Sequence, residues 1–317
     1  MRLQFYLRFH TEFGQSLWIT GNTEELGNND PAKACAMEYL NQDFWQCSLD
    51  VKRKELQSPV LYKYILKNKD NELLFEWGND RFIEVDKNID ELQLTDTWNH
   101  AGEYENVFYS DAFRDVLLKS GNAKTRIPAD KKHTHIFKIK APLLKKHEVV
   151  CLLGNGERLG EWREDKPVLL AKDNDWWTIK LDLIGNNFPL AYKYGVYNSR
   201  EKKFICYEDG NNRLLYSDVS KKKLTILHDG FIHLPNNTWK GTGVAIPVFS
   251  LRTKKSFGVG EFTDIRPLAD WAKATGLKLI QLLPVNDTTS THSWLDSYPY
   301  SAISAFALHP LYINLWN

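Results

Sequence analysis

Aromatic side chains are the residues in this sequence whose chemistry points most directly to a ligand. The 317 residues include 11 Trp, 14 Tyr and 16 Phe. A ring can cover a flat apolar ligand face while polar groups around it hydrogen bond to the ligand's edge. Some of these rings must belong to the core. So many Trp residues nevertheless favour a surface that stacks on flat apolar ligand faces.

Four carboxylates near the end of the sequence are candidates for acid–base chemistry: Glu261, Asp264, Asp287 and Asp296. Glu261 and Asp264 stand where a helix is expected to begin, and acidic residues cap helix starts. Asp287 and Asp296 lie in expected loops, where carboxylates act as ligands or are merely solvated. We therefore expect none of the four to be catalytic.

The cysteines offer no metal site. Cys35, Cys47, Cys151 and Cys206 form no CxxC or Cys/His cluster, so we expect no zinc or other metal and free, buried thiols in a reducing compartment. Gly258-Val-Gly260 lacks the third glycine of a dinucleotide loop, because Thr263 stands in its place. We therefore expect no nucleotide and no other cofactor.

Charge and hydropathy exclude several classes of partner. The formal net charge is +1, with 43% hydrophobic and 26% charged residues, which gives no electrostatic reason to expect nucleic acid. No run of eighteen apolar residues exists, so we expect no membrane span. The first ten residues alternate polar and apolar, which is typical of a strand and not of a signal peptide. A cytoplasmic location is the resulting expectation.

An internal repeat organises the first two thirds of the chain. Four segments recur in order at an offset near 130 residues, which suits two whole domains. The matched pairs are Leu17–Gly27 with Val150–Gly160, Phe44–Leu49 with Trp176–Leu181, Tyr62–Tyr64 with Tyr192–Tyr194, and Gly78–Arg81 with Gly210–Arg213. The sequence therefore predicts a duplicated domain.

Each copy has the pattern of antiparallel β-structure. Apolar residues alternate with polar ones through Leu3–Phe9, Trp45–Val51 and Trp177–Leu183, as in strands with one wet face. This alternation predicts that the side chains of Trp45 and Trp177 point into the core, together with the tyrosine pairs Tyr62/Tyr64 and Tyr192/Tyr194. A short helix is expected over Ser110–Lys119, followed by a polar linker over Gly121–His133.

After about residue 240 the pattern changes to strand, helix, strand. Gly243–Ser250 and Leu277–Pro284 are apolar runs typical of strands buried on both faces, and Ile265–Thr275 between them has a helical apolar face that ends at Gly276. This is a βαβ unit with parallel strands. The predicted segments are 1–97 and 134–222 (sandwiches), 98–133 and 223–240 (linkers), and 241–317 (the βαβ segment).

The second copy resembles family-20 carbohydrate-binding modules, the immunoglobulin-like starch-binding domains. Three landmarks carry the resemblance: Leu159–Trp162, Tyr192–Tyr194 and Tyr207–Arg213. It implies a site in which two rings stack on successive glucose units while polar side chains bind hydroxyls. By position, the rings are Trp162 and Tyr207, and the polar groups are Lys193, Glu208 and Asn211.

The first copy departs from that pattern. Asn29 stands where the second copy has Trp162, whereas Lys63 is retained. Phe75, Glu76 and Trp77 occupy the segment that matches the second ring, and whether these rings belong to the core or to a site is left open by the sequence. We expect weaker or altered binding in this copy.

Residues 241–317 resemble the beginning of a family-77 4-α-glucanotransferase of the disproportionating enzyme 2 type. The resemblance rests on Gly243–Arg252, Ser256–Phe262, Ser297–Ala307 and His309–Asn314. It implies the opening of a (β/α)₈ barrel, truncated here, in which Tyr300 contacts a sugar in the active-site groove. The catalytic carboxylates of the family lie beyond residue 317, so we expect this chain to bind starch, glycogen or maltodextrin and to transfer nothing.

Two other classes of protein stay open beside the enzyme. One is a stand-alone glucan-targeting protein without catalysis. The other is a regulatory glycogen sensor in a complex, which gives no reason for the barrel-like segment Pro299–Phe306.

Overall fold

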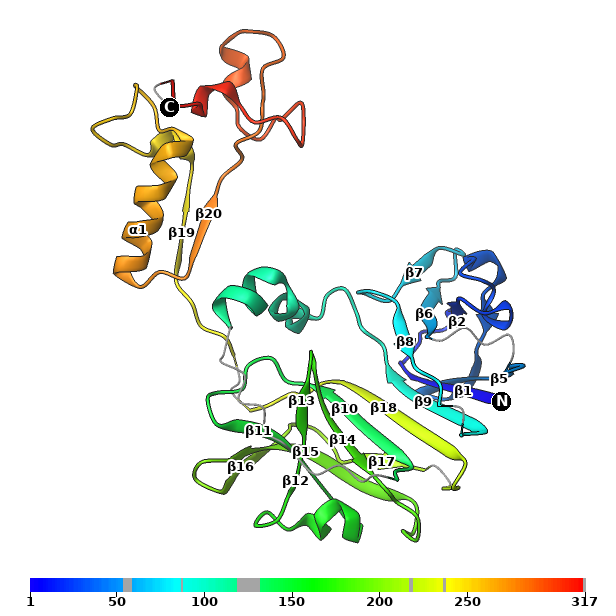
Figure 1. Cartoon of the computed structure of the whole chain (residues 1–317). Coiled ribbons are helices and arrows are strands. Elements are labelled where there is room, and N and C mark those ends of the chain that lie inside the picture. Colours follow the sequence, from blue (N-terminus) through cyan, green and yellow to red (C-terminus); the bar gives the residue numbers. More distant parts are fainter. Residues whose placement is uncertain (54–58, 87, 119–131, 217–218, 236–237, 316–317) are drawn as a thin grey trace. The chain divides into compact units, whose positions relative to one another are not determined.

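The computed structural model describes residues 1–53, 59–86, 88–118, 132–216, 219–235 and 238–315. The chain forms two compact units, Met1–Asn237 and Thr238–Asn317, and Figure 1 traces their elements. Among the described residues, no helix has the length and apolar character needed to cross a membrane.

The first copy is a β-sandwich of two sheets. Its inner sheet consists of β1 (Arg2–Arg8), β4 (Glu38–Asn41), β5 (Phe44–Asp50) and β9 (Glu91–Thr97). Its outer sheet consists of β2 (Ser16–Gly21), β3 (Cys35–Ala36), β6 (Val60–Lys67), β7 (Leu73–Phe75) and β8 (Arg81–Ile83). Pairing is antiparallel throughout except between β1 and β9, which run parallel.

The second copy repeats this plan. Its inner sheet consists of β10 (His135–Lys140), β13 (Ala171–Asp173), β14 (Trp176–Leu181) and β18 (Lys223–Phe231). Its outer sheet consists of β11 (Glu148–Gly154), β12 (Val168–Leu169), β15 (Leu190–Asn198), β16 (Lys203–Tyr207) and β17 (Arg213–Leu215). The parallel pair is here β10 with β18.

Short helices fill the connections. The first copy has 3-10 turns at Glu24–Leu26 and Pro31–Lys33, and the second has one at Glu157–Trp162. Between the copies lie a 3-10 helix at Tyr104–Tyr109 and a π-helix at Ala112–Leu117. This π-helix lies within the segment where a helix was expected. Most of the expected linker after it, through residue 131, lies outside the described residues.

Alternating apolar residues build both cores. Leu3, Phe5 and Leu7 of β1 are fully buried, as the period-two pattern predicts. The prediction that the repeated aromatic residues are structural is also confirmed, since all of them are at least 90% buried: Trp45, Trp177, Tyr62, Tyr64, Tyr192 and Tyr194. These rings belong to the two cores.

A buried carboxylate anchors the tyrosine pair in each copy. In the second copy, both tyrosine hydroxyls of β15 donate to Asp229 at 2.9 Å, and Arg213 lies 3.3 Å from the same carboxylate. In the first copy, Tyr62 and Tyr64 donate to Asp96 at 2.8 Å. Burial by itself raises the pKa of Asp229, but Arg213, Arg8 and the two hydroxyls hold that pKa below its usual value.

The two sandwiches share one sheet. Its strand order is β13-β14-β10-β18-β9-β1-β5-β4, and β18 and β9 pair in parallel from Lys223↔Glu91 to His228↔Asp96. β18 and β9 run beside each other in Figure 1. The segment 223–240, expected as a linker, therefore begins with a core strand. Its lysine-rich start resembles a linker, whereas Leu224–Leu227 is almost continuously apolar because both faces of β18 are covered.

Side chains also cross this junction. Ile226 of β18 packs into the hydrophobic core of the first copy. Arg8 of β1 donates to Asp229 at 3.1 Å, and the His228 ring nitrogen Nδ1 lies 2.6 Å from Asp96. Each copy therefore completes the buried carboxylate cluster of the other.

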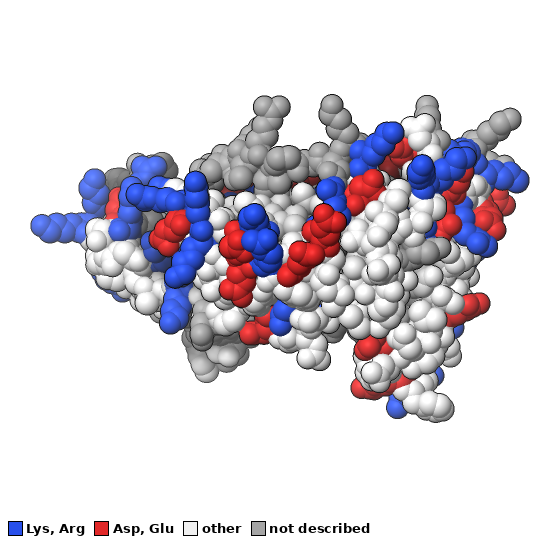
Figure 2. Space-filling model, turned by 90° about the horizontal axis from the view of Figure 1, so that it is seen from below, with Lys and Arg blue, Asp and Glu red and all other residues white. Residues whose placement is uncertain are grey.

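Charged side chains of both signs are interspersed on the face of the molecule shown in Figure 2. Some form exposed pairs, such as Lys222 with Asp90 at 2.9 Å and Arg2 with Asp50 at 3.6 Å. Pairs this exposed contribute little to stability, because solvent screens their charges. The fold therefore depends on its cores and its buried ion pairs.

The second unit contains the expected βαβ motif. Strand β19 (Gly243–Ile246) runs parallel to β20 (Leu279–Leu282), and α1 (Ile265–Thr275) connects them and ends at Gly276 in the left-handed conformation. Short helices lie at Val248–Ser250, Phe262–Asp264, Trp294–Ser297 and Pro310–Tyr312. Both strands alternate exposed and half-buried residues. The expectation that both their faces are buried is wrong for this chain, in which the strands form a two-stranded sheet.

Two neighbouring residues of β18 test whether the copies are coupled. Ile226 packs in the first core and Leu227 in the second. We expect Ile226→Ala to lower the free energy of unfolding by about 2–4 kcal/mol and to speed amide hydrogen exchange in β1, although Ile226 belongs to the second copy. Leu227→Ala is the matched control for the second core. Unchanged exchange in β1 of the Ile226 variant would show that the copies are independent.

Asp229 gives a pH-dependent prediction. Asp229→Asn should lower the free energy of unfolding at pH 7 by about 3 kcal/mol, because Arg8 and Arg213 then face an uncharged group. The folded-state pKa lies below the unfolded value of about 4. The ionised carboxylate therefore stabilises the fold above that value, and this stabilisation is lost as pH falls through the folded pKa.

Urea unfolding of wild type and variant at pH 7, 5 and 3 should show their difference narrowing at pH 3. Asp43→Asn, at an exposed position, is the control, and a difference that stays constant with pH would contradict this account.

Candidate functional site

Trp162 sits in a strained turn. Gly160, Glu161 and Trp162 follow one another in the left-handed region, with φ of 76°, 49° and 58°. Non-glycine residues cost about 1 kcal/mol or more each in this conformation, and such strain gathers at functional sites. The turn holds the half-buried Trp162 ring at the edge of the outer sheet.

Tyr207 meets that ring from the last position of β16. Its Cα partner across the sheet is Gly195 of β15, which follows the core-facing Tyr194 and therefore faces outward. The ring centroids of Trp162 and Tyr207 lie 6.5 Å apart, with the planes inclined by 60°. The structure thus brings together the two rings that the sequence singled out.

Phe204 adds a third ring that sequence reasoning missed. Its centroid is 4.6 Å from that of Tyr207. The two residues are three apart, so strict alternation places them on opposite faces, but a register shift between Val196 and Tyr197 of β15 brings them onto one face. A Cβ at Gly195 would lie 2.8 Å from the Phe204 ring. The glycine is therefore the sequence signal that a ring packs there.

Two of the predicted polar residues, Lys193 and Asn211, are connected through one turn. The Lys193 side chain, on the outward face of β15, donates through Nζ to the Gly210 carbonyl at 2.6 Å. Asn211 follows in the same turn and is exposed. Lys193 therefore shares the outward face of β15 with Gly195, the partner of Tyr207, and its contact with Gly210 links it to the turn of Asn211.

Glu208 is placed differently. It is 4% exposed, its carboxylate accepts two hydrogen bonds from Arg213 at 3.0 and 2.8 Å, and it also accepts the Tyr194 backbone N–H at 3.0 Å. Such a carboxylate fixes the turn that carries Tyr207. Burial first, and then the neighbouring Glu164, raise the pKa of the Tyr207 hydroxyl, so this hydroxyl stays protonated and can donate.

The first copy has the same left-handed turn, but it has no ring at the position of Trp162. Gly27, Asn28 and Asn29 have φ of 79°, 53° and 62°, so Asn29 occupies the conformation of Trp162. Asparagine adopts it more readily than tryptophan. Because Ile65 takes the place of Gly195, the position beside the second ring is filled by a side chain.

Phe75 and Trp77, the two aromatic residues that the sequence offers for this copy, are exposed. Phe75, the Cα partner of Ile65, is 41% exposed and Trp77 is 55% exposed, so neither ring belongs to the core. Lys63 donates to the Gly78 carbonyl at 2.7 Å, as Lys193 does to Gly210. Glu76 is buried against Arg81, like its counterpart Glu208.

In the second unit, the structure gives the acidic residues local roles. Glu261 and Asp264 are buried in a capping box at the start of a helical turn, as expected. Asp287 and Asp296 accept backbone N–H groups of Thr289 and Thr291 within their own loops.

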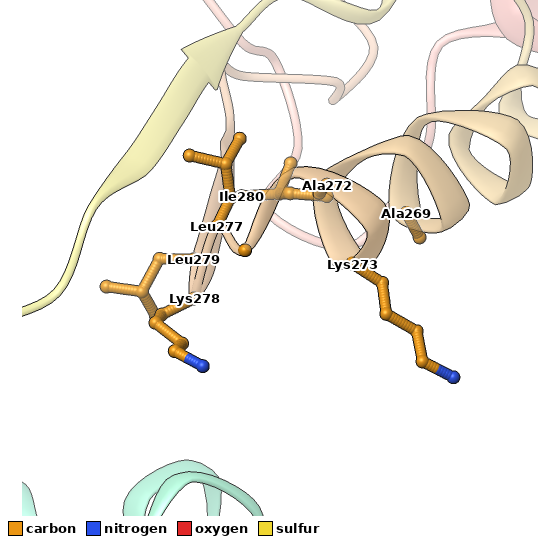
Figure 3. A pocket seen from close by; sticks show the side chains of 8 residues that line it. Ala269, Ala272, Lys273, Leu277, Lys278, Leu279 and Ile280 are labelled. Atoms are coloured by element: carbon orange, nitrogen blue, oxygen red, sulfur yellow. The ribbon is translucent and has the colours of Figure 1, made fainter.

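Tyr300 and a hollow beside α1 are the other features of this unit. The Tyr300 ring is exposed and lies 5.5 Å from that of Tyr298. The hollow in Figure 3 is lined by residues of α1, of β20 and of the turn between them, and these include Lys273 and Lys278. It contains neither a ring nor a carboxylate, so we assign it no ligand.

One group of side chains has the spacing of metal ligands. Ligand atoms of Glu103, Glu105 and His233 lie within 4.8 Å of one another. His233 lies 3.7 Å from Glu105, so its imidazole, when protonated, is already a counter-charge for that carboxylate. Since acidic groups gather in this way without an ion, we assign no metal to the group.

Comparison with known proteins places both parts of the chain. The starch binding domain family model matches residues 1–95 and 134–226, and the 4-alpha-glucanotransferase model matches residues 246–317. This confirms both resemblances. The 4-alpha-glucanotransferase DPE2 of Oryza sativa subsp. japonica is 32% identical over 99% of this chain and 34% of its own length. The chain thus spans about a third of that relative.

Shorter matches were also found. A 4-alpha-glucanotransferase of Chlamydia caviae is 45% identical over 23% of this chain and 13% of its own length. Among solved structures, the family-20 module of a Pseudomonas saccharophila maltotetraose-forming amylase matches 31% of this chain and 100% of its own, at 17% identity and a TM-score of 0.26. The starch-binding model covers more than half of the chain. The chain therefore belongs to the starch binding domain family. It contains two such domains, followed by a segment that matches 4-alpha-glucanotransferases.

Proposed function

We propose that the first unit binds α-1,4-glucan, such as starch, glycogen or maltodextrin, through the aromatic surface of its second copy. The observation that carries the proposal is the group of Trp162, Tyr207 and Phe204 on the outer face of one sheet. Trp162 is held there in a strained conformation that the fold itself does not need, because Asn29 serves the same turn in the first copy.

A glucose ring has an apolar C–H face that an aromatic side chain covers. Because Trp162 and Tyr207 are inclined by 60°, each can face a different sugar of a curved chain. If each ring buries about 100 Å² of apolar surface, the gross gain is about 5 kcal/mol. Association entropy offsets part of it, so we expect an affinity between about micromolar and millimolar.

The polar residues then have separate roles. We assign Lys193 and Asn211 to hydrogen bonds with sugar hydroxyls, since Lys193 shares the outward face of β15 with Gly195 and Asn211 is exposed in the turn that Lys193 contacts. Glu208 acts as a positioning residue through Arg213 and the Tyr194 N–H. In the first copy Phe75, Trp77 and Lys63 form a second surface, with Glu76 in the positioning role. That surface binds more weakly because it has no ring at position 29.

We further propose that the chain serves a 4-α-glucanotransferase in the cytoplasm. Such an enzyme transfers glucan segments or glucosyl units from maltose or maltodextrin to a glucan acceptor with retention. The βαβ motif and the family match of residues 246–317 support this, with Tyr300 as a sugar contact in the groove of a (β/α)₈ barrel. The four free cysteines fit a reducing compartment.

The 317 residues do not themselves provide the chemistry. Retaining transfer needs a nucleophilic carboxylate and an acid about 5 Å apart across the bond, and the candidate carboxylates of the second unit are bound in capping boxes and loops. The chain is therefore the glucan-binding part of the enzyme. A glucan-binding protein without catalysis is the alternative, and the same carboxylates are the observation that favours it.

Trp162→Ala tests the binding site. Losing one of the principal rings should weaken β-cyclodextrin binding at least about tenfold, which corresponds to about 1.4 kcal/mol. Isothermal titration calorimetry on the 317-residue chain measures it, and circular dichroism confirms that the variant is folded. Phe13→Ala, at a fully exposed ring remote in sequence from the site, is the matched control. Retained affinity in a folded Trp162 variant would place the site elsewhere.

Catalysis is tested separately with maltotriose. We expect the 317-residue chain to release no glucose and to form no longer maltodextrin during prolonged incubation, as followed by chromatography of the products. Disproportionation above a heat-denatured control would show that the carboxylates of residues 238–317 suffice, and would refute the assignment of this chain as a binding part.

A further inference from the structure

The two outer sheets lie on opposite faces of the shared sheet. Residues paired across a β-ladder point to the same face. Leu94 and Asp96 of β9 face the first copy's core and tyrosines, and their partners Ile226 and His228 point the same way. Leu227, between those partners, points to the other face and packs in the second core.

The buried carboxylate of the second copy confirms this geometry. Asp229 follows His228 on β18 and accepts hydroxyls from Tyr192 and Tyr194 of the second outer sheet. Asp96 accepts its hydroxyls from the first outer sheet. The tyrosines of the two copies therefore approach the shared sheet from opposite sides.

The candidate surfaces are on the far side of each outer sheet. In the second copy the tyrosines of β15 point inward, so Lys193, Gly195 and its partner Tyr207 point outward. In the first copy the same alternation along β6 directs Lys63, Ile65 and its partner Phe75 outward. The two surfaces therefore face away from each other.

The junction fixes this arrangement. Six residue pairs join β9 to β18, and the contacts of Arg8 with Asp229 and His228 with Asp96 are buried or partly buried. A flexible linker, in contrast, lets two modules turn toward the same ligand. Here the copies cannot turn without breaking the sheet and opening the first core around Ile226.

We propose that the first unit binds two separate glucan chains at once, one on each outer face, and so bridges them. This rests on the proposed function of the two surfaces. Adjacent sheets pack about 10 Å apart, so the outer faces are separated by roughly 20 Å along the sheet normal, with the shared sheet between them.

This geometry selects a class of ligand. A short linear maltodextrin bound on one face has both its ends on that face, so it gains nothing from the second surface. Branched or particulate glucans present many chain ends, and neighbouring particles or branches can occupy both faces. Multivalency then strengthens the attachment without any new contact.

A capture assay with glycogen tests the bridge. Glycogen-coated beads are loaded with the 317-residue chain, washed, and incubated with fluorescently labelled glycogen. We expect the wild type to retain the label. Trp162→Ala, and the double variant Phe75→Ala with Trp77→Ala, should each still bind one glycogen but lose at least about 90% of the retained label. Phe13→Ala should behave as the wild type.

The other outcomes have definite meanings. If the wild type binds the beads and captures no labelled glycogen, bridging is refuted and the proposed glucan binding stands. If it does not bind glycogen at all, both proposals fail. If the single-surface variants still capture the label, the chain bridges by self-association, and the assignment of one chain to each face is wrong.

Calorimetry provides an independent readout. With β-cyclodextrin, which is too small to span both faces, two molecules should bind per chain, falling to one in Trp162→Ala. A stoichiometry of one in the wild type, with the double variant unaffected, would overturn the second surface.

Discussion

The parallel pairing of β9 with β18 is the interaction on which the arrangement of the first unit depends. By itself, each sandwich would leave the last strand of its inner sheet as an edge, with unpaired backbone N–H and C=O groups and fully buried leucines close behind them. Such edges favour aggregation unless they are covered. Pairing the two edges satisfies both ladders at once, and it fixes the faces on which the aromatic surfaces lie.

The buried carboxylates show how the duplicated domains diverged at this junction. Asp96 and Asp229 keep the same tyrosine pair and the same arginine from their own copies. The added partner differs, being His228 for the first and Arg8 for the second. The copies are thus equivalent in their interiors and unequal where they meet, because a contact between two copies does not have to be made by the same residue on each side.

Much of this could be predicted from spacing alone. Period-two alternation located the strands and assigned the tyrosine pairs to the core. The repeat aligned Asn29 of the first copy with Trp162 of the second, and both lie in equivalent left-handed turns. Two features could not be predicted in this way. The register shift between β15 and β16 breaks strict alternation, so the sequence pattern alone does not place Phe204 on the same face as Tyr207. The pairing of β18 depends on a long-range contact, and its lysine-rich start resembles a linker.

The left-handed turn shared by Asn29 and Trp162 has an evolutionary consequence. At this position asparagine lowers the strain and tryptophan raises it. Replacing the tryptophan by asparagine or glycine therefore relieves backbone strain, and drift under selection for folding alone leads toward such a ringless form. Under the proposed function, we expect the tryptophan to persist only while binding itself is selected. In a duplicated domain, the copy that is no longer under that selection loses its ring first and keeps the left-handed turn that once presented it.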